Sequence, residues 1–442
     1  MSPEQMRRVL VVSPHFPPVS AADMQRVRML LPHFQANGWQ AEVLSVVPAQ
    51  TGMSLDPWLL EGVPAHLRVH HAPAWGGVVR RVPGLGTLGL RALRGLARIG
   101  DGLLGARRFD LVYFSTTMFE VHVLGPRWKR RFGVPFVMDY QDAWVSDYYR
   151  DHPEVPPPGG ALKYRLANAL HRWMEPRVLR ACAGITSVSP DYPRQLARRY
   201  PSLPSLPTLV QGFPGAAKDF DRLPAHPRGR PPFDPDDGMV HWVYVGRGGG
   251  DMARSLRALF MALCAHRDTG LLRRLRLHFI GTSYAGSGPG RKTIEPLAAE
   301  FGLQDMVCES PDRIDYSQAL WCLRHADALI VPGSDDPAYT ASKIYPYLLA
   351  GRPLLAVFHQ NSTVADLIRR VRGGVCVSFD NEEPLADVAQ RIARDWLEDG
   401  AHARTVPLDQ RAFHPHSAEG CAQTLAGFFG ACVDTARSGI AG

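Results

Sequence analysis

Short apolar runs alternate with longer stretches of helical spacing through the first half of the chain. Residues 7–13 (RRVLVVS) are a β-branched run bounded by turn residues, which predicts a buried strand. A proline-containing loop follows, then a helical pattern over residues 23–37 that ends at Gly38, and then a second strand pattern, QAEVLSVV. A strand, a helix and a strand in this order predict parallel neighbouring strands. Further strands are expected at 109–115, 134–140 and 181–189, with helices near 120–132 and 191–200.

The second half repeats this alternation. Strands are expected at 241–246, 275–281, 326–332 and 353–358, and helices at 254–266, 294–301 and 341–351. Two successive runs of this kind predict an α/β fold with two doubly wound, Rossmann-like domains. The stretch 212–238 between them is dense in proline, glycine and charge, which is typical of a linker. We therefore expect an N-terminal domain of residues 1–212, a C-terminal domain of residues 213–415 and a last helix over 416–437.

Charge is distributed unevenly between the two halves. Residues 1–212 hold 25 Lys and Arg against 15 Asp and Glu, or +10, whereas the remainder holds 25 against 27, or −2, of the net charge of +8. This asymmetry favours an anionic partner for the first domain. The seven cysteines are scattered without a C-x-x-C pair, which predicts reduced thiols rather than disulfides or a zinc site. Because no membrane-spanning run or secretory signal is recognisable, we expect a cytoplasmic protein.

Parallel sheets bind ligands beyond the carboxyl ends of their strands, so the loops after the expected strands hold the candidate residues. In the second domain, Gly246, Arg247 and Gly248 follow the strand 241–246, and Gly281 and Thr282 follow the next one. Glycines let backbone approach a phosphate closely, and an arginine can bind two phosphate oxygens at once. The alternative is a surface turn with a solvated arginine.

A second candidate group lies where a helix begins after the strand 326–332. Free N–H groups in the first turn of a helix form an anion site, and a lysine there adds a full positive charge. The alternative is an ordinary capped helix whose lysine points to water. The residues concerned are Thr340, Ser342, Lys343 and Ile344.

The first domain offers polar residues at two strand ends. Carboxylates or amides after the strand 134–140 could orient an acceptor hydroxyl or a sugar, and the loop after residues 7–13 could close over a donor. The alternatives are a helix-capping aspartate, a packed tryptophan and, for Asp23, a simple helix cap. The candidates are Asp139, Gln141, Asp142 and Trp144 at the first end and His15, Ser20 and Arg26 at the second.

Two further features bear on partners. Asp335 and Asp336 could bind a metal, but no D-x-D follows a strand in the first half, so no metal site is expected. Residues 76–108 combine leucines with seven arginines, and residues 85–99 suit either a basic amphipathic helix on an anionic membrane or a surface helix with its leucines in the core.

These residues resemble the GT-B glycosyltransferases, especially glycosyltransferase family 4 and its relatives in polysaccharide and cell-envelope synthesis. The similarity lies in the order and spacing of segments that cover most of the chain, including VLVVSPHFPPVSAADMQRVRML, FDLVYFSTTMFEVHVLGPRWKRRFGVPFVMDYQDAW, WVYVGR, LHFIGT and ADALIVPGSDDPAYTASKIYPYLLAGRPLLAV. The resemblance implies two domains facing a central cleft, a nucleotide-sugar donor bound in the cleft and an acceptor on the first domain. It also implies metal-independent transfer with retention, and a C-terminal helix that folds back onto the first domain.

The chain departs from the family pattern at several positions. Ala338 and Pro346 stand where many family 4 enzymes have two glutamates, and Gln141 stands where a histidine is often found. The lysine that usually follows the arginine of the glycine loop is missing, and Arg254 is a candidate to replace it. These departures leave the donor sugar, and the contacts to it, open.

Together the observations predict a glycosyltransferase that moves a sugar from a nucleotide-diphosphate donor to a glycan, lipid-linked or small-molecule acceptor. In this prediction Arg247 and Lys343 stabilise the departing diphosphate, and Asp142 or Gln141 orients the acceptor. The nucleotide sugar is a co-substrate, and no cofactor, metal or nucleic acid is expected. The protein is expected in the cytoplasm, with peripheral contact at an anionic membrane through the basic first domain. Two alternatives stay open: a nucleotide-sugar epimerase, and a catalytically degenerate GT-B protein that partners an active transferase.

Overall fold

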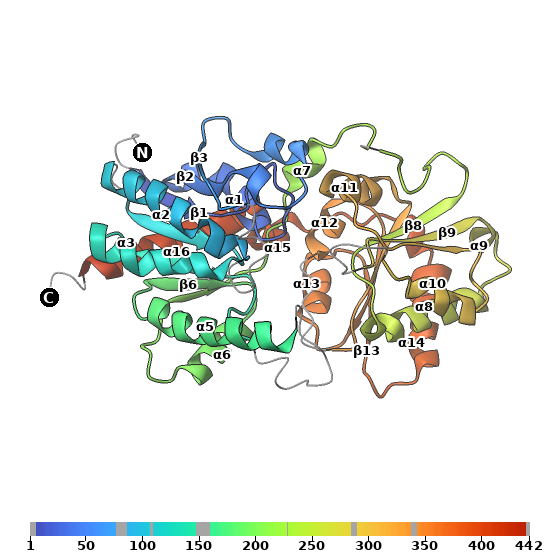
Figure 1. Ribbon diagram of the computed structural model, residues 1–442. Coiled ribbons are helices and arrows are strands. Elements are labelled where there is room, and N and C mark those ends of the chain that lie inside the picture. Colours follow the sequence, from blue (N-terminus) through green and yellow to red (C-terminus); the bar gives the residue numbers. More distant parts are fainter. Residues whose placement is uncertain are drawn as a thin grey trace. The chain divides into compact units, whose positions relative to one another are not determined.

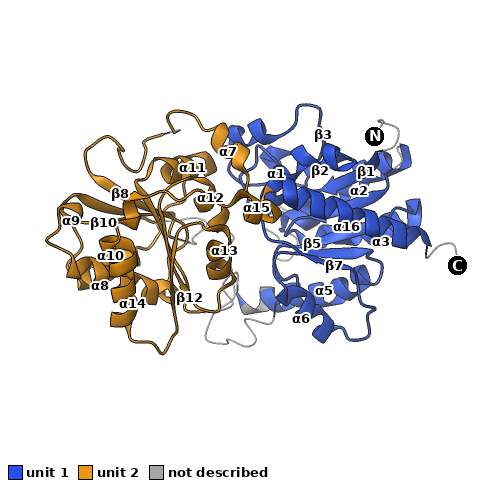
Figure 2. Cartoon of the chain, turned by 180° about the vertical axis from the view of Figure 1, so that it is seen from behind, with its two compact units in different colours: residues 1–214, 418–442 blue, residues 215–417 orange. Residues whose placement is uncertain are grey.

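The computed structural model describes residues 6–76, 86–106, 109–146, 160–227, 229–283, 290–336 and 343–438. The chain divides into two compact units, coloured separately in Figure 2. Unit 1 comprises residues 1–214 and 418–442, and unit 2 comprises residues 215–417. Each unit is built around one parallel sheet, which confirms the predicted α/β class with two doubly wound sheets. All seven cysteines are free thiols.

The sheet of unit 1 has seven strands in the order β3-β2-β1-β4-β5-β6-β7, and every neighbouring pair is parallel. The central strand β1 pairs with β2 on one side, Arg7 opposite Trp39, and with β4 on the other, Val9 opposite Leu111. The strands are β1 (Arg7–Val12), β2 (Trp39–Val46), β3 (Arg68–Ala72), β4 (Leu111–Ser115), β5 (Phe136–Tyr140), β6 (Gly184–Ser187) and β7 (Thr208–Val210).

Helices cover both faces of this sheet, because successive residues of β1 point to opposite sides and residues 9–12 are all apolar. Val9 and Val11 belong to an apolar cluster with α1 and α16, whereas Leu10 and Val12 belong to a second cluster with α2, α3 and α5. The helices of this unit are α1 (Gln25–Phe34), α2 (Leu88–Ala106), α3 (Leu124–Phe132), α5 (Ala161–Leu179), α6 (Asp191–Arg199) and α16 (Ala418–Ser438).

The last helix completes the core of the first unit. Figure 1 shows the red α16 among the blue and cyan elements of residues 1–132. Phe429 lies against Tyr113, Trp39 and Phe34, with ring centroids 4.9, 5.5 and 6.0 Å away. The Trp39 indole donates to the Ala426 carbonyl at 3.2 Å. The helix therefore closes the face of the sheet that α1 covers only in part.

Helix α2 contains the basic stretch that suited either a membrane surface or the core. Leu88, Leu96 and Leu104 are buried in the cluster beneath α2 and α3, and Arg91 is buried with its guanidinium donating to the Trp75 carbonyl at 2.7 Å. The leucines of this helix are therefore used for packing, and the membrane-binding interpretation of residues 85–99 is wrong for those leucines. Within the described ranges, no helix is long and apolar enough to cross a membrane.

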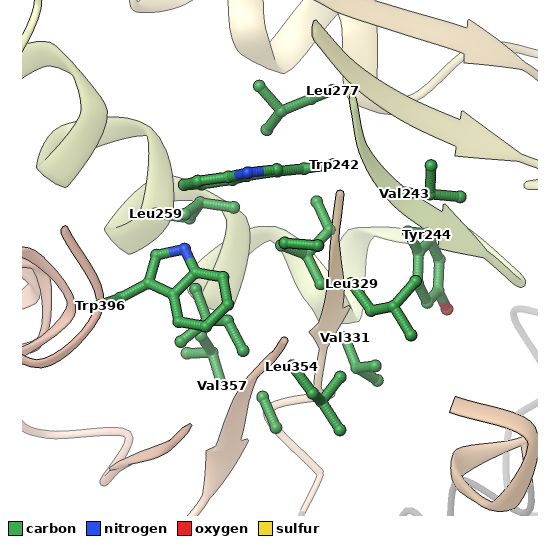
Figure 3. Close-up of a cluster of buried hydrophobic side chains, with 14 of the residues drawn as sticks. Trp242, Val243, Tyr244, Leu259, Leu277, Leu329, Val331, Leu354, Val357 and Trp396 are labelled. Carbon is green, nitrogen blue, oxygen red and sulfur yellow. The ribbon is translucent and has the colours of Figure 1, made fainter. Parts of the chain in front are cut away.

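The sheet of unit 2 has six parallel strands in the order β10-β9-β8-β11-β12-β13. Figure 3 shows its core, in which Trp242 of β8 and Trp396 lie among Leu329 and Val357. The two indoles meet edge to face at 5.5 Å. The strands are β8 (Val240–Val245), β9 (Leu275–Ile280), β10 (Val307–Ser310), β11 (Ala328–Pro332), β12 (Leu354–His359) and β13 (Val375–Phe379).

The longest helices of unit 1, α2, α5 and α16, exceed every helix of unit 2 in the described part of the chain. Trp396 itself lies in a π-helical turn, Ala393–Glu398, which continues α14. The helices are α7 (Ala217–Asp221), α8 (Ala253–Ala265), α9 (Gly270–Arg274), α10 (Ile294–Glu300), α11 (Tyr316–His325), α12 (Ile344–Leu349), α13 (Thr363–Val371), α14 (Leu385–Ile392) and α15 (Gln410–Phe413).

Both sheets have a topological switch point. In unit 1 the chain runs from β1 outward to β2 and β3 and then returns to the other side of β1 as β4. In unit 2 it runs from β8 to β9 and β10 and returns as β11. Ligands of such sheets bind beyond the carboxyl ends of the strands at this point. A binding site is therefore expected in the loops after β1 and β4 of unit 1 and in those after β8 and β11 of unit 2.

Candidate functional site

The glycine loop after β8 is held closely against its neighbours in unit 2. The Gly246 N–H donates to the Ile280 carbonyl at 2.9 Å, and the Gly248 N–H donates to the Thr282 carbonyl at 2.8 Å. A Cβ on Gly246 would lie 2.5 Å from the Tyr244 hydroxyl, and one on Gly248 would lie 3.0 Å from Thr293 Oγ1. A side chain at Gly246 would therefore force Tyr244 to move, and one at Gly248 would be a tight fit against Thr293.

Arg247 is held at the start of this loop by an acidic neighbour. Its two terminal nitrogens both donate to the Asp251 carboxylate, at 2.8 and 2.5 Å. The hydrogen bond from Arg247 is the main reason that the pKa of Asp251 is lowered. The Asp335 N–H, on the loop after β11, donates to the Asp251 carbonyl at 2.9 Å. Asp251 thus connects Arg247, in the loop after β8, with the loop after β11.

Lys343 lies on the other side of the switch point, directly before α12. Solvent reaches its side chain, yet partial desolvation and the positive charges of Arg313 and Arg247 lower the pKa of its ammonium group to about 8. Arg313 follows β10, whose carboxyl end lies at the same edge of the sheet. The positive charges of Arg313 and Arg247 thus both act on Lys343 at this edge.

Helix α12 is fixed to β8 by a tyrosine. The Tyr347 hydroxyl accepts from the Val245 N–H at 2.6 Å and donates to the Val245 carbonyl at 3.0 Å. Ile344, the first residue of α12, is buried, and Lys343 occupies the capping position without a side-chain cap. The predicted contacts of Thr340 and Ser342 lie outside the described residues.

The two candidates after β9 have structural contacts. Gly281 has a φ of +71°, a conformation in which glycine is favoured, and its N–H donates to the Ser310 carbonyl. The Thr282 hydroxyl donates to the buried Glu309 carboxylate at 2.6 Å. Glu309 also accepts the N–H groups of residues 293–295 at the start of α10. The side chain of Thr282 is thus committed to holding this helix end.

Unit 1 contains a buried charge pair at the carboxyl ends of its central strands. Arg26 and Asp139 are both essentially unexposed, with Arg26 Nε 3.1 Å from Asp139 Oδ2. Asp139 also accepts from the hydroxyls of Ser115 and Thr186, each at 2.8 Å. Asp139 and Arg26 therefore do not face a ligand as the sequence suggested, because each is used to neutralise the other inside the unit.

A second aspartate, Asp23, contacts a histidine at the same edge of the sheet. His15 Nδ1 is 2.9 Å from Asp23 Oδ1, and both residues are more than nine-tenths buried. The other oxygen of Asp23 accepts from the Thr116 hydroxyl at 3.0 Å and from the Thr117 N–H at 3.4 Å. The capping position of α1 belongs to Met24, so Asp23 orients the histidine rather than capping the helix.

Gln141 joins the two acidic groups of unit 1. Its amide nitrogen donates to Asp139 Oδ2 at 2.8 Å, to the Ser115 hydroxyl at 3.0 Å and to the Asp23 carbonyl at 3.0 Å. Its amide oxygen is buried and has no hydrogen-bond partner among the residues that the structure describes. A buried polar atom without a partner is costly, so this oxygen marks a place where a polar ligand group is expected.

The remaining candidates of unit 1 lie apart from this network. Asp142 is exposed and accepts from the adjacent Ala143 N–H at 2.8 Å. Trp144 is buried and stacks on Phe119 at 5.7 Å, so it is a packed core residue rather than an acceptor contact. Ser20 is half-buried, and its N–H donates to the Ser54 carbonyl at 2.8 Å.

Several residues of these groups were not predicted from the sequence. In unit 2 they are Arg313 and Asp251, and in unit 1 they are the hydroxyls that hold the two aspartates. Thr116 directly follows the strand expected at 109–115, so its position at the carboxyl edge of the sheet could have been predicted from the sequence. The expected replacement of the missing lysine by Arg254 is wrong, because that guanidinium donates to the Glu383 carbonyl and lies over the Phe379 ring.

Comparison with known proteins agrees with the fold. Residues 24–210 match the family model described as Glycosyl transferase 4-like domain. No curated protein matches the chain in a sequence search.

Three solved structures illustrate the structural similarity. Anabaena Alr3699/HepE, solved with UDP and glucose, is 15% identical with a TM-score of 0.56, covering 96% of this chain and 100% of its own. A UDP-forming α,α-trehalose-phosphate synthase from Burkholderia xenovorans is 12% identical with a TM-score of 0.55, covering 96% and 98%. The N-terminal domain of Candida albicans trehalose-6-phosphate phosphatase is 10% identical with a TM-score of 0.56, covering 96% and 97%.

At these identities the solved structures show the fold, and the family match shows a similarity that is confined to residues 24–210. The chain therefore has the GT-B fold of these structures, and its residues 24–210 are similar to the glycosyl transferase 4-like domain.

Proposed function

We propose that the protein transfers a sugar from a nucleoside diphosphate sugar to an acceptor hydroxyl, and that Arg247 and Lys343 bind the donor diphosphate. The observation that carries this proposal is the group of basic residues at the switch point of unit 2. Desolvation, and then the positive charges of Arg313 and Arg247, lower the pKa of Lys343 to about 8, so an anion placed there would stabilise the charged ammonium. The solved relatives with UDP and with UDP-glucose support this choice of ligand.

The chemical role of these residues is electrostatic. As the bond between the anomeric carbon and the phosphate oxygen breaks, negative charge accumulates on the departing diphosphate. Arg247 is already oriented by Asp251, and a guanidinium has five N–H donors, so it can bind Asp251 and phosphate together. We propose that these cations serve in place of a divalent metal, and transfer is therefore expected to continue in excess EDTA.

Donor affinity tests the site directly. Arg247→Ala and Lys343→Ala are each expected to weaken UDP binding by roughly 1.5–3 kcal/mol, about 10- to 150-fold in Kd, because each removes a charge-assisted hydrogen bond. Isothermal titration calorimetry with UDP measures this. Arg273→Ala is the matched control, because Arg273 is exposed on α9 at the opposite end of β9. Unchanged affinity in both site variants would refute the assignment.

The acceptor is proposed to lie on unit 1. Its excess of basic residues favours an anionic acceptor, such as a lipid-linked glycan with phosphate groups at a membrane surface. Transfer assays with phosphorylated and neutral acceptors distinguish these classes. Conversion of the nucleotide sugar without any acceptor would instead indicate an epimerase, and nucleotide binding without turnover would indicate a partner protein.

The stereochemical outcome depends on which group takes the proton of the acceptor. Resemblance to family 4 implies retention, in which an oxygen of the departing phosphate takes that proton. No protein base is then required.

A further inference from the structure

Lysine is rare in this chain, yet one lysine lies at the carboxyl ends of the strands in unit 2. Five of the 50 Lys and Arg residues are lysines, at positions 129, 163, 218, 292 and 343. An arginine binds phosphate through two parallel hydrogen bonds, so phosphate binding alone does not require a lysine at position 343. What a lysine adds is an amine that can lose its proton and act as a nucleophile.

The amine of Lys343 is accessible to reagents. Lys343 is exposed, and within the described ranges it makes no ion pair and donates no side-chain hydrogen bond. Lys292, in contrast, is paired with Glu295 at 2.6 Å, and the hydrogen bond to that carboxylate raises the pKa of the lysine. Lys218 on α7 is exposed like Lys343 and belongs to the same unit. Lys218 is therefore an internal standard for the reactivity of an ordinary lysine.

Two guanidinium groups act on the amine of Lys343. Partial desolvation, and then the charges of Arg313 and Arg247, lower the pKa of this amine to about 8. At pH 7 about a tenth of the amine is then unprotonated, against roughly one part in 3,000 for a lysine of ordinary pKa. Arg313 is exposed and has no ion pair in the part of the chain that the structure describes, so its charge is available to an anion. An anion that carries an electrophile is therefore attracted to the position where the reactive amine lies.

We propose that Lys343 is a site of acylation by acyl phosphates, the mixed anhydrides of a carboxylic acid and phosphate, and that acylation prevents tight donor binding. The neutral amine attacks the carbonyl carbon, the bond from that carbon to the phosphate oxygen breaks, and its electron pair leaves with the phosphate. The nitrogen releases one proton to water, so an amide forms without oxidation or reduction. The amide is uncharged, so the cation proposed to bind the donor diphosphate is lost. The effect on the donor rests on the proposed function, whereas the acylation does not.

The phosphate group favours this class of reagent over uncharged acylating agents. Its negative charge is attracted by the guanidinium groups of Arg313 and Arg247. The same cations stabilise the charge that accumulates on the phosphate as its bond to the acyl group breaks. Acylation of Lys343 is thus expected to depend on these cations, whereas acylation of Lys218 is not.

The rate of acylation is the first test, with the full-length protein and acetyl phosphate as the reagent. Peptide mass spectrometry at pH 8 compares the acetylation rates of Lys343 and Lys218, and Lys343 is expected to react at least about tenfold faster. Acetic anhydride, which has no phosphate group, is expected to give a clearly smaller ratio. A ratio near one with acetyl phosphate, or equal ratios with the two reagents, would overturn the proposal.

Arg313→Gln tests whether the phosphate is guided. The variant removes one cation, so its ratio with acetyl phosphate is expected to fall at least about threefold more than its ratio with acetic anhydride. Arg273→Gln is the matched control, because Arg273 is exposed on α9 at the opposite end of β9, and it is expected to leave both ratios unchanged. An equal fall with both reagents in Arg313→Gln would show that Arg313 acts on the amine alone, which contradicts guided acylation.

The effect on the donor is measured by calorimetry before and after treatment with acetyl phosphate. Acetylated protein is expected to bind UDP about 10- to 150-fold more weakly, and UDP present during the treatment is expected to protect Lys343. Lys343→Arg cannot form the amide, so its UDP affinity is expected to be the same before and after. Unchanged affinity of the acetylated parent, or an equal loss in Lys343→Arg, would overturn the link to donor binding. A parent protein that binds no UDP before treatment would refute the proposed function, and the two acetylation ratios would still test the modification.

Discussion

A single lysine at the edge of unit 2 has an unusual acid–base property. Partial desolvation and two nearby guanidinium groups bring the pKa of Lys343 to about 8, so its charge changes within the range in which enzymes are assayed. An anionic ligand reverses this situation, because it stabilises the ammonium form. The ligand and the proton are therefore expected to bind cooperatively at this residue.

This coupling predicts the pH dependence of nucleotide affinity. Below pH 8 the free protein has a charged Lys343 and binds UDP well. Above pH 8 the free protein loses that charge while the complex keeps it, so binding must also take up a proton. The Kd for UDP is thus expected to rise about tenfold between pH 7 and pH 9. Calorimetry at the two pH values measures it.

Lys343→Arg provides the matched control, because an arginine stays charged throughout this range. Its UDP affinity is expected to be nearly equal at pH 7 and pH 9. If the parent protein shows no change, or if the arginine variant weakens equally, another group is responsible for the dependence.

The sequence predicted the positions of the candidate residues at the sheet edges better than it predicted their burial and contacts. Arg247 and Lys343 were expected at the edge of the second sheet, and the structure has them there. Arg26 and Asp139 were expected to face a ligand, but they are buried against each other. The local sequence pattern, a charged residue near the end of a strand, is the same whether the side chain is exposed or buried in an ion pair. Only the packing of distant segments, such as Gln211, whose carbonyl accepts from Arg26, decides between them.

At the scale of elements, the central strands were predictable and the edge strands were not. The four strands missing from the expected set are β3, β7, β10 and β13, which are the edges of the two sheets. Edge strands are covered on fewer sides, so they carry polar and exposed residues such as those of RVHHA in β3. The apolar signal that identifies a strand therefore weakens where the sheet ends.

The packing of α2 against α3 gives an element-scale prediction. A Cβ on Gly100 would lie 2.3 Å from the Trp128 ring, so Gly100→Ala is expected to destabilise unit 1 by about 1–3 kcal/mol through overpacking. Gly102 is in the same helix and has no neighbouring atom within 4 Å of such a Cβ. Gly102→Ala is therefore expected to stabilise by about 0.5–1 kcal/mol, the usual gain from replacing a helical glycine.

Hydrogen–deuterium exchange of peptides from α2, with calorimetric unfolding of the whole protein, measures both changes. The two substitutions are chemically identical and two residues apart, so their difference isolates the contact with Trp128. Equal effects of the two would contradict this account of the helix interface.

At the scale of the molecule, the basic first half includes an exposed apolar stripe on α5. Leu166, Leu170 and Trp173 are spaced along one face of the helix, with Trp173 56% exposed. The Arg177 guanidinium lies 4.2 Å from the centre of the Trp173 ring. Tryptophan beside arginine is favoured at the interface between water and an anionic bilayer. We propose this stripe as the membrane contact that α2 cannot make.

Vesicle sedimentation tests this proposal. The protein is expected to bind vesicles that contain phosphatidylglycerol more strongly than neutral phosphatidylcholine vesicles, with less binding at high salt because charge is screened. Trp173→Ala is expected to weaken that binding. Trp75→Ala is the control, because Trp75 is 53% exposed in the same unit but away from α5. Equal loss in both variants, or no preference for anionic lipid, would contradict the proposal.

The return of α16 to unit 1 has a consequence for biosynthesis. Unit 2 is one uninterrupted stretch of chain, whereas unit 1 is interrupted by it. A ribosome working at about 5–20 residues per second needs roughly 10–40 s to make residues 215–417. During that time the hydrophobic face later covered by Phe429 is exposed to solvent. The half that is translated first is thus the last to mature, and a nascent-chain chaperone would be most useful to it in that interval.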